Sequence, residues 1–172
     1  MAQPEPGSLF MHHFIKVAYS RFLKIRGEPR QIARGLALGT MVGMTPFMGL
    51  HTVIAVFLAA LCKWNKLSAA VGVFITNPIT APFIYPITYL VGKTFIGASS
   101  IPLIDKSLSF DTIFSLIKNS PLILVDLLAG GIITGLPLSI AVYFVALKTV
   151  ENYRRKVKPE LRRLTGRQID IF

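Results

Sequence analysis

The sequence predicts an all-α protein: a small polytopic membrane bundle with Pro-broken or re-entrant helices. Three observations support this fold class. Hydrophobic residues make up 52% of the 172 residues. The sequence contains three apolar, uncharged runs: Gly35–Cys62, Leu67–Val91 and Leu127–Leu147. A membrane span needs only about 20 such residues. The first two runs carry proline near their middles, where a regular helix cannot continue.

The chain divides into a membrane domain with a basic flank on each side. Residues 1–29 are predicted to contain an interfacial amphipathic helix, because apolar and basic residues recur at helical spacing over Leu9–Arg26. Residues 30–148 form the predicted membrane domain. Residues 149–172 form a basic cytoplasmic tail, which also reads as an amphipathic helix. An amphipathic segment around Phe110–Lys118 is expected at the opposite membrane surface.

The basic residues determine the expected topology. The net charge is +11; six of the 19 Lys and Arg residues lie in Lys16–Arg34 and eight in Lys148–Arg167. Cytoplasmic flanks are rich in such residues, so both termini are expected in the cytoplasm. Three full spans would place the two basic flanks on opposite sides of the membrane, which the distribution of Lys and Arg opposes. If Gly35–Cys62 is re-entrant, 16 of the 19 basic residues lie in the cytoplasm. If Leu67–Val91 is re-entrant instead, 14 lie there, so the first arrangement is preferred.

The composition also bears on partners and chemistry. Basic clusters beside apolar runs attract anionic headgroups, so membrane lipids are the expected partners and nucleic acid is not. Cys62 is the single cysteine, which excludes an internal disulfide and a cysteine-pair metal site. The sequence contains no paired carboxylates, metal-ligand cluster or phosphate-binding loop. We therefore expect no enzymatic activity, no cofactor and no metal.

Small residues recur at four-residue intervals in two of the runs. This spacing lets helix backbones approach closely in lipid. The glycines predicted to pack helices together are Gly35, Gly39, Gly43, Gly131 and Gly135. Packing within one chain is the first interpretation, and a seam between copies in a homo-oligomer is the alternative.

The first break centres on Thr45 and Pro46. Pro46 removes a backbone donor, and Gly49 allows conformations that are closed to other residues. His51 is the only histidine inside an apolar run. Its imidazole can hydrogen-bond the freed backbone, or it can contact a substrate or carry a proton. The sequence leaves both roles open.

The second break contains Asn77, Pro78 and Thr80. Asn77 precedes a proline and is therefore pushed away from helical geometry; its amide can cap the turn or face a ligand. Half-helix N-termini attract anions, and carriers often place substrate sites where broken helices meet. The predicted substrate-binding residues are Arg34, Thr45, Pro46, Gly49, His51, Asn77, Pro78 and Thr80, with Arg34 as a charge partner near the cytoplasmic mouth.

At these residues the chain resembles a bacterial membrane family known as domain of unknown function 2062. The resemblance covers roughly Gly27 to Lys148. It lies in Gly39 through Pro46, Gly49-Leu50-His51, Asn65, Asn77-Pro78-Ile79-Thr80-Ala81-Pro82, and Tyr89 followed by Gly92. It implies a small bacterial inner-membrane protein without a settled activity, of a kind that is joined in some members to glycosyltransferase or methyltransferase domains.

Two functions are compatible with these features. The leading hypothesis is a carrier or flippase-like protein for a small anionic solute or lipid headgroup, held between the two breaks. The alternative is a non-transporting scaffold or accessory protein of envelope lipid or glycan synthesis, in which the breaks are structural and the basic tails dock partners or anionic lipid. Either would be a multi-pass protein of the bacterial inner (cytoplasmic) membrane.

Overall fold

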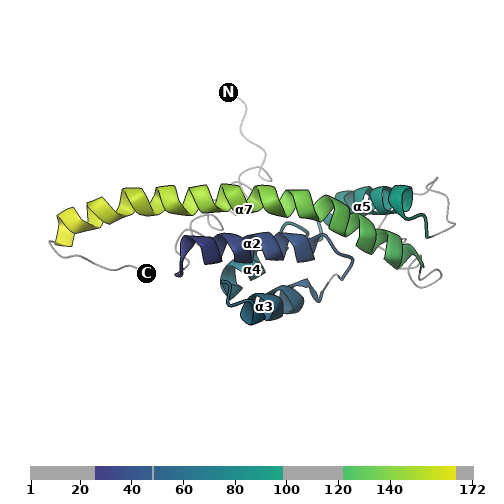
Figure 1. Ribbon diagram of the computed structural model, residues 1–172, viewed down its shortest axis with the longest axis horizontal. Helices are drawn as coiled ribbons and strands as arrows, with labels where there is room; N and C mark the ends of the chain where they lie inside the picture. The colour runs from purple at the N-terminus through teal and green to yellow at the C-terminus, as the bar shows by residue number, and fades with distance from the viewer. Residues whose placement is uncertain (1–25, 48, 99–121, 166–172) are drawn as a thin grey trace, which may run out of the picture.

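The computed structural model describes residues 26–47, 49–98 and 122–165, with side chains as far as Arg155. Every regular element in these ranges is a helix, as the sequence predicts (Figure 1). The helices are α2 (Pro29–Gly43), α3 (His51–Leu61), α4 (Lys66–Val73), α5 (Ala81–Phe95) and α7 (Leu122–Thr165). The predicted N-terminal amphipathic helix, apart from its last residue, and the segment around Phe110–Lys118 lie outside the described residues.

The helices α2 and α3 form a hairpin. Pro29 occupies the first turn of α2, where its missing N–H removes no helical hydrogen bond, and α2 ends shortly before Pro46. The chain then reverses through a turn in which Gly49 adopts a φ of +92°, a conformation that glycine reaches without steric cost. By the end of α3 the chain has returned to the start of α2, where Asn65 N donates to Gln31 O at 3.2 Å.

The next helix, α4, runs parallel to α2 and packs on it through small residues. The side chain of Asn65 caps α4 by accepting a hydrogen bond from Ser68 N at 2.9 Å. A Cβ atom on Gly35 would collide with Asn65 O and Ser68 Oγ, and one on Gly39 would collide with the Ala69 carbonyl. The two backbones therefore lie so close that only small residues fit between them.

The long helix α7 lies antiparallel to both α5 and α2 and contacts them along different parts of its length (Figure 1). Its first turns cross α5, where Gly130 packs on the carbonyl of Thr88. One residue later, Gly131 packs on the backbone of Met44 at the end of α2. Further along, Ala146 joins a buried cluster with the first turns of α2. Therefore α2 and α5 follow one another along α7 and point the same way.

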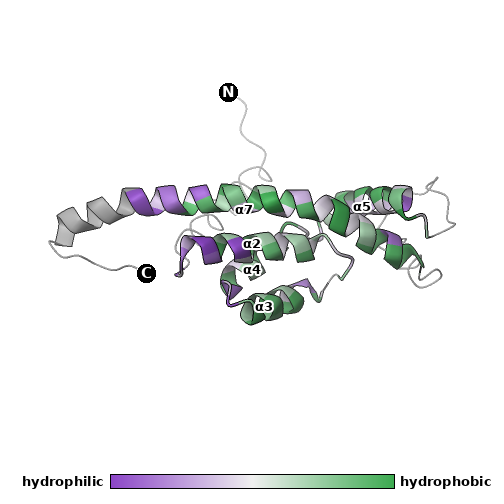
Figure 2. Ribbon diagram, viewed as in Figure 1, coloured by the Kyte–Doolittle hydropathy of each residue, from purple (hydrophilic) through white to green (hydrophobic). Residues whose placement is uncertain are grey.

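Small and polar residues occupy much of the interior, and many large apolar side chains are exposed. Figure 2 shows that α3, α5 and the first half of α7 consist mostly of apolar residues. The alanines without exposed surface are Ala33, Ala55, Ala59, Ala69 and Ala81. The buried polar residues are Thr40, His51, Ser68, Thr76, Thr88, Asp126 and Ser139. The large side chains that are more than half exposed include Val53, Phe57, Leu67, Phe83 and Phe144, from α3, α4, α5 and α7. Soluble monomers seldom expose apolar surface on this scale.

By length and composition, α7 can span a membrane. Its segment Leu122–Arg155 has 34 residues and a mean hydropathy of 2.0 in its most apolar window. The helix continues to Thr165, so the start of the predicted C-terminal tail prolongs it. Each of α2 and α5 has 15 residues, which gives about 22 Å at 1.5 Å per residue and falls short of a hydrocarbon core of about 30 Å.

Candidate functional site

The first break is closed by hydrogen bonds within the chain. His51 begins α3 with a side chain that is only 4% exposed, and its Nε2–H donates to Thr45 O at 2.7 Å. The Thr45 hydroxyl donates to Val42 O at 2.6 Å. Because Pro46 has no N–H to donate, these side chains replace backbone bonds that a continuous helix would make. His51 thus makes a hydrogen bond to the freed backbone, as the first of its two predicted roles requires; we call this its bracing role.

The second break is likewise capped by its own residues. Asn77 Oδ1 accepts hydrogen bonds from Ile79 N at 2.9 Å and from Thr80 N at 3.1 Å, and Asn77 Nδ2 donates to Phe74 O at 3.3 Å. The Thr80 hydroxyl donates to Ile75 O at 2.9 Å and accepts from Asn77 N at 2.9 Å. These bonds lead the chain from the end of α4 into the first turn of α5.

The two breaks begin at the same level of the bundle. A Cβ atom on Gly43, the last residue of α2, would lie 3.6 Å from the hydroxyl of Thr76 in the second break. That hydroxyl is buried, and no group in the described ranges hydrogen-bonds to it. By contrast, the side chains of His51, Asn77 and Thr80 bond to nearby backbone. The paired breaks therefore contain one buried hydroxyl without a partner in the described ranges, rather than a ring of free polar groups.

The structure separates the predicted site residues into two groups. The first group belongs to the two breaks and consists of Thr45, Pro46, Gly49, His51, Asn77, Pro78 and Thr80. Within this group, Gly49 and Pro78 are exposed on their turns. Arg34 lies 11 residues before Thr45 on the chain, a distance of about 16 Å along a helix. The predicted charge partner is therefore not brought together with the breaks.

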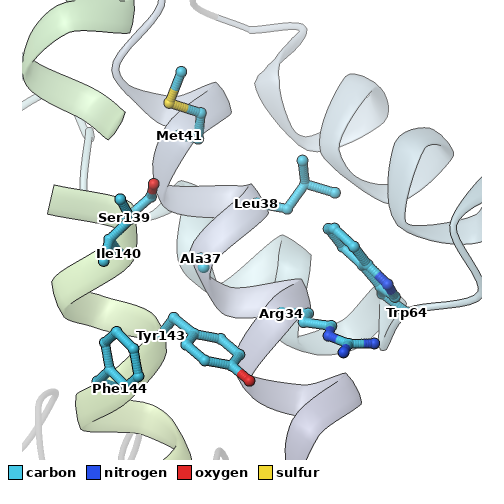
Figure 3. Close-up of a pocket in the computed structure, with 9 residues that line it drawn as sticks. All are labelled: Arg34, Ala37, Leu38, Met41, Trp64, Ser139, Ile140, Tyr143 and Phe144. Atoms are coloured by element: carbon cyan, nitrogen blue, oxygen red, sulfur yellow. The ribbon is translucent and has the colours of Figure 1, made fainter. Parts of the chain in front are cut away.

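Arg34 instead lines a groove of about 410 Å³ that crosses the outer face of α2 (Figure 3). The described lining residues are Arg34, Ala37, Leu38, Met41, Trp64, Ser139, Ile140, Tyr143 and Phe144. Figure 3 shows the α2 residues between Trp64 on one side and the α7 residues on the other. Arg34 and Met41 mark the two ends of the α2 floor, and Arg34 alone among the described lining residues is charged.

The sequence reasoning found Arg34 but not this groove. Trp64 comes from the turn between α3 and α4, and Tyr143 comes from α7, so the walls meet only after three distant segments have packed. One signal was available in the sequence. Trp64 is the only tryptophan and follows Lys63 beside an apolar run, a pattern that is typical of aromatic residues at a membrane interface.

Most described charged residues gather at one end of the bundle, which we call the basic end. Hydrogen bonds join the segments that meet there: Asn65 Nδ2 donates to Arg26 O at 2.8 Å, and Arg154 donates to Gly27 O. The basic residues of this end are Arg26, Arg30, Arg34, Lys63, Lys66, Lys148, Arg154 and Arg155, and its acids are Glu28 and Glu151. Figure 2 shows these hydrophilic stretches at the start of α2 and in the later part of α7.

Lys93 and Asp126 are the described charges of the other end. Asp126 is fully buried near the start of α7, and one of its carboxylate oxygens accepts a hydrogen bond from Ala98 N at 2.9 Å. Between the two ends, α7 is uncharged over Leu127–Leu147, about 31 Å at 1.5 Å per residue, which matches a hydrocarbon core. Within the described ranges, no three His, Cys, Asp or Glu side chains converge as metal ligands would.

No curated protein and no solved structure matches the chain. A family model does match it, over residues 12–158, and that model describes an uncharacterized protein conserved in bacteria. The matched range includes both breaks, the groove and the helices that form the basic end. The chain therefore belongs to the bacterial family of domain of unknown function 2062 (DUF2062).

Proposed function

We propose that this protein is an integral protein of the bacterial cytoplasmic membrane that holds anionic lipids at its basic end. The charge distribution carries the proposal. Eight basic and two acidic described residues gather at one end, next to an uncharged layer that matches the thickness of a hydrocarbon core. Lipid chains would cover the exposed apolar side chains, and each basic residue near an anionic surface contributes about 1 kcal/mol of attraction.

In this proposal, α2 and α3 enter the membrane from the basic end as a re-entrant hairpin. The helices α4 and α5 then cross in one direction, and α7 crosses back. The hydrogen bond from Asn65 N to Gln31 O supports the hairpin, because it returns the end of α3 to the level at which α2 begins. Both flanks then lie on the side that is rich in Lys and Arg, which is the cytoplasmic side.

Cysteine labelling tests this topology. Cys62 is the only cysteine and is exposed in the turn between α3 and α4. A membrane-impermeant maleimide should label it in inside-out vesicles and not in intact cells, and Asn152→Cys in a Cys62→Ser background should behave the same way. In the same Cys62→Ser background, Ile96→Cys, just past α5, should be labelled in intact cells and not in inside-out vesicles. Labelling of Cys62 from outside intact cells would contradict the re-entrant hairpin.

Native mass spectrometry of the protein released gently from its own membrane tests whether it holds lipid. We expect a discrete anionic lipid at fixed stoichiometry. That lipid should be depleted in a triple variant, Arg30→Gln, Lys66→Gln and Lys148→Gln. The matched control exchanges the same three positions between Lys and Arg, which retains the charge. Equal retention of anionic and zwitterionic lipids by the wild type would refute the proposal.

A carrier or flippase-like activity is the second candidate, and the buried hydroxyl of Thr76 favours it. This buried hydroxyl lies where the two breaks begin and has no partner in the described part of the chain, so a polar group that reached it as the breaks separated would gain a hydrogen bond. In vesicles with a fluorescent anionic lipid, a carrier would expose inner-leaflet fluorophores to added dithionite, and Thr76→Val would slow that exposure. A scaffold that only holds lipid would leave those fluorophores protected.

A further inference from the structure

We infer that the groove across α2 binds an acyl chain of one anionic phospholipid while Arg34 pairs with the phosphate of that lipid. The inference rests on the proposed function and assigns it a site. At about 410 Å³, the groove lies within the range of about 300–1,000 Å³ that is usual for small-molecule sites. Ala37, Leu38 and Met41 form its floor, and Ile140 and Phe144 belong to its α7 wall, so most of its surface offers only apolar contact.

Arg34 supplies the headgroup contact. Its side chain is exposed, and it forms no ion pair or hydrogen bond with any group in the described ranges. A guanidinium binds phosphate through two parallel N–H···O bonds, which gives both energy and orientation. The acids of the basic end, Glu28 and Glu151, are not among the described residues that line the groove. An anionic headgroup therefore meets an available cation and no competing carboxylate in the groove wall.

The direction of the groove matches that of a lipid in the bilayer. Arg34 stands immediately before the uncharged part of α2, and Met41 lies 7 residues further into that part, about 10 Å at 1.5 Å per residue. A phosphate at Arg34 would thus lie at the interface, with its chain running into the hydrocarbon layer. Trp64 and Tyr143 flank the groove, and such aromatic residues favour the interface. The lipid need not leave its leaflet or turn over to bind.

The same features select an anionic lipid over other occupants. A zwitterionic lipid brings an ammonium group toward Arg34 and the cations around it, which weakens the attraction. Free phosphate could pair with Arg34 but would gain nothing from the apolar floor. The occupant that satisfies both ends of the groove is an amphiphile with an anionic head.

The single tryptophan makes the groove directly observable. Trp64 is the only tryptophan and lines the groove, and bromine atoms on an acyl chain quench indole fluorescence on contact. The full chain would be placed in vesicles of unlabelled phosphatidylcholine that contain a minor fraction of dibrominated phosphatidylglycerol or, in parallel, of dibrominated phosphatidylcholine. The anionic lipid should quench Trp64 at a roughly tenfold lower fraction, the effect of one charge-assisted hydrogen bond.

Arg34→Gln should abolish that preference, and Arg34→Lys should retain part of it. Lys93→Gln is the control, because it removes one positive charge at the other end of the bundle, from a residue that is not among the described residues lining the groove. Ala37→Phe should reduce quenching by filling the floor. Equal quenching by the two brominated lipids, or an equal loss of preference in Arg34→Gln and Lys93→Gln, would overturn the assignment of this groove. If native mass spectrometry then still found bound anionic lipid, the proposed function would stand without this site; if it found none, both would fall.

Discussion

Replacing His51 with alanine measures the value of the bond that closes the first break. The ring is 4% exposed and donates to Thr45 O at 2.7 Å. Its loss leaves the Thr45 carbonyl unsatisfied, at a cost of about 1–3 kcal/mol. The cavity in place of the ring adds about 1 kcal/mol. His51→Ala should therefore lower the free energy of unfolding by about 2–4 kcal/mol.

The assay is equilibrium unfolding in mixed micelles with increasing SDS, followed by far-ultraviolet circular dichroism. His51→Gln keeps an N–H donor and should recover much of the lost stability. Thr52→Ala is the control, because Thr52 is the exposed neighbour on the same helix and should change stability by less than about 0.5 kcal/mol. A His51→Ala protein as stable as the wild type would refute the bracing role. If the Gln and Ala variants lost equal stability, the donor would not be what matters.

Three further substitutions test other parts of the structure. Gly39→Leu should destabilise the same unfolding equilibrium by about 1–3 kcal/mol or more, because any Cβ there meets the Ala69 carbonyl; Ala141→Leu on the exposed side of α7 should be close to neutral. Asn77→Ala should cost about 1 kcal/mol and speed hydrogen exchange of the two amides that its side chain caps, and unchanged exchange would contradict the capping. Thr76→Val should stabilise the ligand-free protein slightly, because it removes a buried hydroxyl without a described partner; destabilisation would reveal a ligand or water that satisfies it.

Much of the fold could be predicted because it depends on local properties. Pro46 and Pro78 both fall between helices, so both breaks were placed correctly in the chain. Pro86, by contrast, lies inside α5, so a proline alone does not predict a break. The spacing of Gly35 and Gly39 indicates close helix packing, but it does not name the partner. The structure identifies that partner as α4, because the contact joins residues about 30 positions apart, beyond the reach of any local pattern.

The sequence by itself determined the all-α class, the uncharged runs, the two breaks and the concentration of basic residues beside those runs. Each of these follows from backbone sterics, hydrophobicity or charge at successive positions. Only the tertiary structure decided which polar groups are used. It turned His51, Asn77 and Thr80 toward nearby backbone, and it placed Arg34 in an apolar groove away from both breaks. Hydrogen-bond satisfaction and cavities depend on which distant segments pack together, so they exist only once the helices have assembled.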